Sequence, residues 1–135
     1  MNEQENRMMS AQALAYLGDC VIELCVRSLL LEKGLAHSKD LNKAALRYVS
    51  ATAQAEAMKQ ILPALSEEET GVYRRAFNHK GLSRPAHASY GEYRAATGFE
   101  AVLGALHYLG EKERLAFLLD AIHENEFIAK EDIPK

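Results

Sequence analysis

The spacing of apolar side chains is the feature that most limits what this chain can fold into. Between Ala11 and Lys33, apolar residues recur every three or four positions, which is the period of an α-helix. Gly34 follows directly and is typical of the residue that ends a helix. No segment alternates between apolar and polar residues over six positions, so the sequence predicts no β-sheet. We therefore expect an all-α protein.

The rest of the chain also divides into helical segments. Ser66 and Glu69 form a capping box, in which each side chain bonds to the other residue's backbone N–H at the start of a helix. Pro63 ends the segment before it. The other expected helices are, in chain order, residues 38–62, as one helix or as two broken near 49–52, then 66–77, 92–109 and 111–127, with a loop over 78–91.

Length and composition fit one globular domain. A chain of 135 residues with 48% apolar and 26% charged residues can build one core but not two. We expect a single domain over 1–135 with its core between about 11 and 127. The first ten residues have no basic and apolar regions of a signal peptide, and no apolar run approaches the roughly 18 residues of a membrane span. A cytoplasmic protein without a membrane partner is expected.

Cys20 and Cys25 are five residues apart in one expected helix. Their Cα atoms are then about 8 Å apart, too far for a disulfide bond. Five is also no usual spacing of metal ligands, and the chain has no other cysteine. We expect both to be reduced, small core residues.

Two carboxylates interrupt the most apolar helices. Asp19 follows a glycine, Gly18, and Glu100 also has apolar neighbours. A glycine inside a helix costs about 1 kcal/mol relative to alanine, so Gly18 indicates a close approach by another element. Buried carboxylates are costly unless paired, so each acid either pairs with an arginine such as Arg27 or Arg94 or binds a metal ion.

Magnesium is the metal that these acids fit best. Mg²⁺ prefers carboxylate oxygens and water, and two such acids beside a basic loop match a metal-assisted phosphodiester hydrolase. In an arbitrary helical protein, a surface acid or a simple ion pair is the commoner explanation. Glu23 lies one turn after Asp19 and either supports the site or pairs with Arg27; we favour the pair with Arg27.

A local excess of positive charge precedes the helix of Glu100. Residues 74–94 hold five basic residues and one acid, a net charge of +4, although the whole chain carries −3. Such an island on an acidic chain favours a directed anion site, to which His79 and His87 can add charge. A solvated charged loop is the alternative.

Three segments resemble one known family. Residues 14–21, Leu-Ala-Tyr-Leu-Gly-Asp-Cys-Val, are similar to the ribonuclease III signature, and 93–106, with Gly-Phe-Glu-Ala-Val-Leu-Gly, to its second helix. Residues 74–80, Arg-Arg-Ala-Phe-Asn-His-Lys, before a loop with Pro85, resemble the Mini-ribonuclease III branch, which lacks the double-stranded RNA-binding domain; this chain leaves no room for one. The resemblance covers roughly residues 11–120.

The resemblance implies a Mg²⁺-dependent endoribonuclease for double-stranded RNA, with Asp19 and Glu100 as catalytic residues and metal ligands. It also implies a homodimer around the signature helix, a staggered cut with 5′-phosphate ends, and the stem of the large-subunit (23S) ribosomal RNA precursor as substrate. Full-length ribonuclease III enzymes carry one further acid in each motif, at the positions of Ala15 and Thr97 here. The Mini-ribonuclease III branch also lacks them, so the departure supports that branch.

The resemblance also implies a partner for the basic residues of 74–94, double-stranded RNA. Duplex RNA is recognised largely through phosphates and 2′-hydroxyls, and the predicted contacts come from Arg74, Arg75, Asn78, Lys80, Arg84 and Arg94. Nearby tyrosines 73, 90 and 93 can stack on bases, but more often such residues are core with a wet hydroxyl.

Two alternatives remain open. A non-catalytic ribonuclease III-like RNA-binding or scaffold protein is disfavoured because it typically loses the acids. A purely structural helical interaction domain leaves the paired acids and the basic window unexplained.

Overall fold

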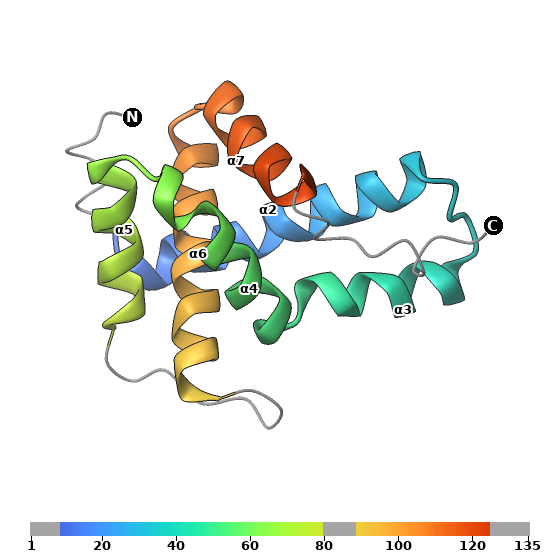
Figure 1. The fold of residues 1–135 in the computed structure, drawn as a ribbon, viewed down its shortest axis with the longest axis horizontal. Helices are drawn as coiled ribbons and strands as arrows, with labels where there is room; N and C mark the ends of the chain where they lie inside the picture. The colour runs from blue at the N-terminus through green and yellow to red at the C-terminus, as the bar shows by residue number, and fades with distance from the viewer. Residues whose placement is uncertain (1–8, 80–88, 125–135) are drawn as a thin grey trace.

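The structure, a computed structural model, describes residues 9–79 and 89–124. Over these residues it has six α-helices, one short 3-10 helix and no strand, which confirms the expectation of an all-α protein. None of these helices is long and apolar enough to cross a membrane. The elements are α2 (Ala11–Glu32), α3 (Ser38–Val49), α4 (Ala51–Ile61), η1 (Leu62–Ala64), α5 (Glu67–Phe77), α6 (Tyr90–Tyr108) and α7 (Lys112–Glu124) (Figure 1).

Most helix ends lie where local sequence signals predict them. Helix α2 is followed by Gly34, which has a φ of 96° and donates its N–H to the Leu31 carbonyl at 3.1 Å. This left-handed conformation favours glycine and satisfies a carbonyl at the helix end. The segment at 38–62 is indeed two helices, divided at Ser50, whose hydroxyl caps α4.

Helix α6 begins two residues earlier than predicted. Its N-cap is Ser89, whose hydroxyl accepts from the Glu92 N–H at 3.1 Å, while the Glu92 carboxylate accepts from the Ser89 N–H at 3.0 Å. This second capping box begins at Ser89, within the segment 78–91 that the sequence predicts to be a loop. Gly91, in the same segment, is helical. The rest of that loop, 80–88, lies outside the described residues, as does the predicted end of the last helix at 125–127.

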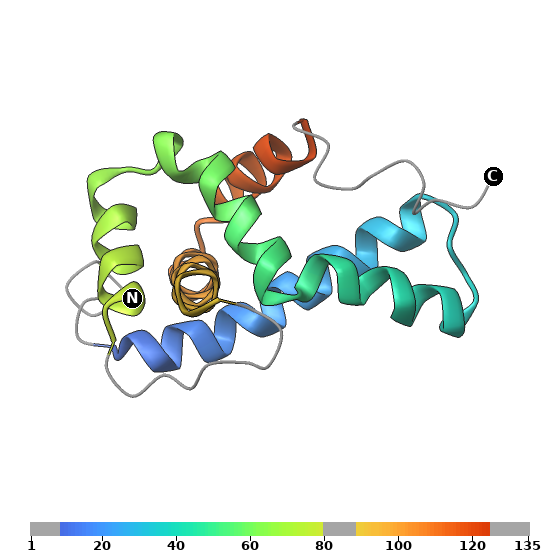
Figure 2. The same cartoon turned by 60° about the horizontal axis from the view of Figure 1, so that its bottom comes forward.

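Helix α6 is the central element of the fold. Helices α2, α4 and α5 all pack against it, and Figure 2, which looks nearly along the α6 axis, shows them on three sides of it. Its buried residues include Phe99, Val102 and Leu103. Burying each such side chain contributes about 1.5–3 kcal/mol, so α6 holds much of the core.

Glycines set the distance between α2 and α6. A Cβ atom on Gly18 would lie 1.6 Å from the Glu100 carbonyl oxygen, and one on Gly104 would lie 2.0 Å from the Leu14 carbonyl oxygen. Both helices therefore cross with their backbones in direct contact, which only residues without a Cβ allow. The close approach predicted at Gly18 is confirmed.

Both cysteines are free, as predicted, but only one packs near the core. Cys25 is partly buried and contacts the core cluster, and burial raises the pKa of its thiol. Cys20 is exposed, so the expectation that it is a core residue is wrong. The reason is the crossing: Gly18, not Cys20, lies on the face of α2 that meets α6.

Candidate active site

The crossing of α2 and α6 brings Asp19 and Glu100 to one pocket. Gly18 packs on the backbone of Glu100, so the residue after it, Asp19, lies beside that turn of α6. The pocket has a volume of about 250 Å³. Its lining residues come from α2, α6 and the end of α5: Ala11, Gln12, Ala15, Tyr16, Asp19, His79, Tyr93, Thr97 and Glu100.

The two carboxyl groups differ in environment. Asp19 is exposed, so the expectation of two buried carboxylates is wrong for it, whereas Glu100 is mostly buried. Burial, the negative charge of Asp19 and a hydrogen bond with Asp19 together raise the pKa of Glu100 to about 8. The Glu100 carboxyl therefore holds its proton more tightly than an exposed glutamate does.

The arginines offered as alternative partners bond elsewhere. Arg27 pairs with Glu23 at 2.8 Å, which confirms the predicted pair and gives Glu23 a partner on its own helix. Arg94 donates to the Phe77 carbonyl at 2.8 Å. The group that acts on the Glu100 carboxyl is instead Asp19.

The sequence did not assign the neutral polar residues of the pocket to the site: Thr97 was noted only as the position of an acid in full-length ribonuclease III enzymes, and Tyr93 only as a stacking candidate. Gln12 lies two turns and Tyr16 one turn before Asp19 on α2, and Tyr93 and Thr97 precede Glu100 on α6 at the same two spacings. Their spacing could have identified them, because residues three, four and seven positions apart lie on the same face of a helix. The Thr97 hydroxyl donates to the Tyr93 carbonyl at 2.9 Å, so its oxygen can still accept.

The two carboxylates can hold a magnesium ion. Among the described residues no group of three or more His, Cys, Asp or Glu side chains is arranged to hold a metal ion. Mg²⁺ commonly takes one or two protein carboxylates and fills its other positions with water and substrate phosphate oxygens. A cation between Asp19 and Glu100 would also relieve the repulsion that raises the pKa of Glu100. The donor set therefore fits the ion.

The predicted RNA-binding residues do not all lie on a loop. Arg74 and Arg75 lie in the last turn of α5 and are exposed, as is Asn78, which caps that helix. Arg94 lies in α6. Lys80 and Arg84 lie outside the described residues.

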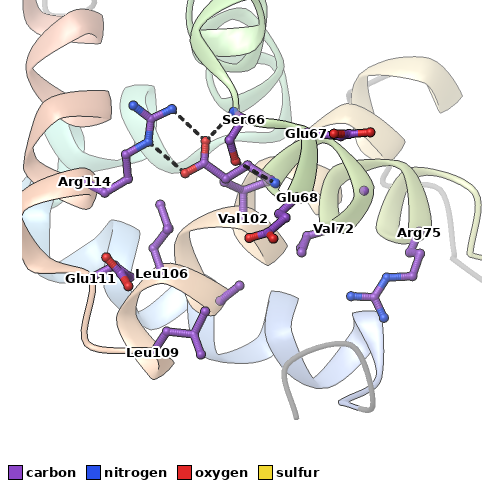
Figure 3. A pocket seen from close by; sticks show the side chains of 13 residues that line it. Ser66, Glu67, Glu68, Val72, Arg75, Val102, Leu106, Leu109, Glu111 and Arg114 are labelled. Atoms are coloured by element: carbon purple, nitrogen blue, oxygen red, sulfur yellow. Dashed lines mark hydrogen bonds and ion pairs between the residues drawn. The ribbon is translucent and has the colours of Figure 1, made fainter. Parts of the chain in front are cut away.

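A second, larger cavity of about 910 Å³ lies between α5 and the α6–α7 turn and has a different character (Figure 3). Glu67, Glu68 and Glu111 line it, over an apolar floor that includes Val102 and Leu106. Neither Asp19 nor Glu100 lines this cavity. Two arginines, Arg75 and Arg114, also line it. Because Asp19 and Glu100 meet in the smaller pocket, that pocket is the candidate active site.

Comparisons with known proteins agree with this site and fold. A family model described as the ribonuclease III domain matches residues 12–111. The chain is 50% identical to the Mini-ribonuclease 3 of Symbiobacterium thermophilum, over 80% of this chain and 83% of that protein. It is 45% identical to the Mini-ribonuclease 3 of Brevibacillus brevis, over 84% and 87% of the two chains. An X-ray crystal structure of a Fusobacterium nucleatum protein superposes with a TM-score of 0.77 at 32% identity, covering 87% of this chain and 93% of that one.

Over the described residues the fold is all helical, and its central crossing brings two carboxylates to one pocket. With the matches above, the chain belongs to the ribonuclease III family, and its class of activity is that of an endoribonuclease. Relatives called Mini-ribonuclease 3 match most of its length.

Proposed function

We propose that this chain is a Mg²⁺-dependent endoribonuclease that cuts double-stranded RNA, working in the cytoplasm as a single-domain homodimer. The observation that carries the proposal is the pairing of Asp19 and Glu100 in one pocket. We further propose that the substrate is a base-paired stem of the large-subunit (23S) ribosomal RNA precursor. This choice rests on the resemblance to the Mini-ribonuclease III branch.

Asp19 and Glu100 would hold the ion, and Glu100 would lose its proton on binding it. The ion supplies polarisation of a phosphoryl oxygen and a water of lowered pKa. In the hydrolysis, a water oxygen forms a bond to phosphorus and the bond from phosphorus to the 3′-oxygen breaks. The products are a 5′-phosphate and a 3′-hydroxyl, which takes up the proton that the water releases.

The basic residues at the end of α5 are proposed to bind the RNA backbone. Arg74, Arg75 and Asn78 are exposed on one end of that helix, and the next residue, His79, lines the carboxylate pocket. Lys80 and Arg84 continue the same stretch of sequence. A duplex bound along this stretch would bring a phosphate to Asp19 and Glu100.

A homodimer is proposed because α2 exposes apolar side chains that a monomer would leave in water. Tyr16 is 75% exposed, Leu24 67% and Leu31 58%, all on the helix that carries Asp19. Two copies related by a two-fold axis would bury this surface and present two sites, one for each strand.

The non-catalytic alternative is disfavoured by the same pair of acids. An RNA-binding scaffold has no use for a partly buried carboxyl whose pKa is raised by burial and by a second acid in the same pocket. It would bind RNA through the basic residues alone.

The test is cleavage of a defined RNA duplex by Asp19→Asn and Glu100→Gln. Each should lose at least about 10³-fold in kcat, equivalent to roughly 4 kcal/mol of barrier, because a metal ligand is lost. Both should keep the helical circular dichroism and the RNA affinity, and EDTA should stop the wild-type enzyme. Glu23→Gln is the matched control, because Glu23 pairs with Arg27 on the same helix and should be dispensable. Near-normal turnover of either site variant would disprove the assignment.

A further inference from the structure

The guanidinium of Arg94 binds other groups of the protein. One nitrogen donates to the Phe77 carbonyl at 2.8 Å and another to the Tyr90 hydroxyl at 3.2 Å. The guanidinium carbon also lies 4.5 Å from the centre of the Tyr90 ring, within the range of a cation–π contact. The side chain is only partly exposed.

The bond to Phe77 joins the end of α5 to the start of α6. Phe77 is the last residue of α5, and the last carbonyls of a helix have no partner within the helix. A cation at this end is also favoured by the helix dipole. Arg94 is 17 residues away in the sequence, so this bond is a tertiary contact between the two helices.

The end of α5 leads directly into the carboxylate pocket. His79 is two residues after Phe77, its backbone N–H donates to the Ala76 carbonyl at 3.2 Å, and its side chain lines the pocket with Asp19 and Glu100. The carbonyl that Arg94 bonds thus lies two residues before a residue that lines the pocket.

We propose that Arg94 is a positioning residue of the active site. By holding the end of α5 on α6, it places the imidazole of His79 where that ring donates a hydrogen bond to the phosphate of the bound RNA strand. Asp19 and Glu100 are acceptors, whereas imidazole carries an N–H donor in both of its charge states. His79 also directly follows the exposed residues Arg74, Arg75 and Asn78. The inference rests on the proposed ribonuclease function and assigns Arg94 a role different from the RNA contact predicted from the sequence.

Conservative variants of Arg94 separate the two roles. Lysine keeps the charge but lacks the fork of donors that reaches two acceptors at once. A positioning role predicts that Arg94→Lys and Arg94→Gln both lose kcat, by on the order of 10²-fold. It also predicts that the salt dependence of RNA binding by Arg94→Gln is that of the wild type. A backbone contact predicts that Arg94→Lys stays active and that Arg94→Gln lowers the salt slope by about one unit.

Two further variants calibrate these measurements. Arg74→Gln shows what the loss of a proposed backbone contact does to the salt slope. Lys112→Gln removes an exposed charge from the first residue of α7 and should change neither kcat nor the slope. Circular dichroism of all variants checks that the fold is retained.

The link between Arg94 and His79 is tested by combining Arg94→Gln with His79→Ala. If Arg94 acts through His79, the double variant loses no more kcat than the stronger single variant. Histidine labelled with ¹⁵N gives a reading that does not need turnover: the His79 ring resonance should shift when a short RNA duplex is added in EDTA, and less so in Arg94→Gln.

Each outcome decides the inference. Near-wild-type kcat in Arg94→Lys, a reduced salt slope in Arg94→Gln, multiplicative losses in the double variant, or a His79 resonance indifferent to RNA would overturn it while leaving the ribonuclease assignment intact. Failure of the wild-type protein to cut any duplex with Mg²⁺ would overturn the proposed function, and this inference with it.

Discussion

Glu69 shows how one side chain can join two helices. One of its carboxylate oxygens accepts from the Ser66 N–H at 2.8 Å and completes the capping box of α5. Both oxygens also accept from Arg114 of α7, at 2.8 Å each, as the dashed lines from Arg114 in Figure 3 show. A forked pair of this kind is stronger than a single hydrogen bond, so Glu69 stabilises both a helix start and a helix contact.

Acid should weaken the fold through Glu69. Its burial favours the protonated form, but the hydrogen bonds from Arg114 and Ser66 outweigh burial and hold the pKa of Glu69 below its usual range. A lowered folded-state pKa gives stability that is complete above the unfolded value of about 4.3 and is lost as the pH falls through the folded-state pKa. Urea unfolding should show Glu69→Gln less stable than the wild type by about 1–3 kcal/mol at pH 7.

That difference should shrink as the pH falls below about 4.3. Glu67→Gln is the control, because Glu67 is exposed in the same first turn of α5. A difference between Glu69→Gln and the wild type that is constant from pH 7 to pH 3 would contradict the assigned cause.

The sequence could predict half of what Glu69 does. Its bond to Ser66 spans three residues and follows from the capping pattern. Its bond to Arg114 spans 45 residues, and no local pattern indicates that partner. Asp19 and Glu100 were recognisable because a carboxylate among apolar residues is unusual, whereas Gln12 looked like an ordinary polar position.

At the scale of elements, the site depends on the crossing of α2 and α6. Each helix contributes one carboxylate and one glycine to it, Asp19 with Gly18 and Glu100 with Gly104. The helices themselves followed from periodicity and caps, which are local. The crossing did not, because the partner of Gly18 lies some eighty residues away, although the glycine correctly indicated that something must come close.

Alanine at either glycine should damage the fold and the site together. The new Cβ of Gly18→Ala or Gly104→Ala would meet backbone oxygen, which cannot move aside, so α2 and α6 must separate. We expect a loss of about 3 kcal/mol in the free energy of unfolding, measured by urea denaturation. Cleavage should fall even where the protein remains folded, because Asp19 and Glu100 move apart.

Gly71→Ala is the matched control for this prediction. Gly71 is helical and exposed in α5, and a Cβ there meets nothing within 4 Å. Alanine should therefore stabilise the protein by roughly 0.5–1 kcal/mol, the usual difference in helix propensity. If Gly18→Ala were as stable as Gly71→Ala, the two helices would not cross as described.

At the scale of the whole molecule, charge and apolar surface are unevenly distributed. The exposed basic residues Arg74 and Arg75 end α5, whereas its first turn carries Glu67, Glu68 and Glu69. Arg75 lines the larger cavity together with these glutamates. A phosphate backbone would be attracted to one end of α5 and repelled from the other. The net charge of −3 alone gave no hint of this polarity.

Exposed apolar side chains on α2 make the oligomeric state the property hardest to derive from one chain. Periodicity indicated a helix, but not what covers its outer face. Leu24 and Leu31 are seven residues apart, two helical turns, and therefore share that face. If two copies associate there, charge on this face should separate them, because an unpaired carboxylate at an apolar interface is costly.

We expect the wild type to sediment at micromolar concentration with about twice the mass of the 15.0 kDa chain, and Leu24→Asp and Leu31→Asp to sediment as monomers. Tyr108→Asp is the control, since Tyr108 is also exposed but lies at the end of α6. The monomeric variants should stay helical and should cut a duplex more slowly, one strand at a time, because each particle then has one site. Sedimentation of the wild type as 15.0 kDa particles alone, or of Leu24→Asp as a dimer, would refute an interface on α2.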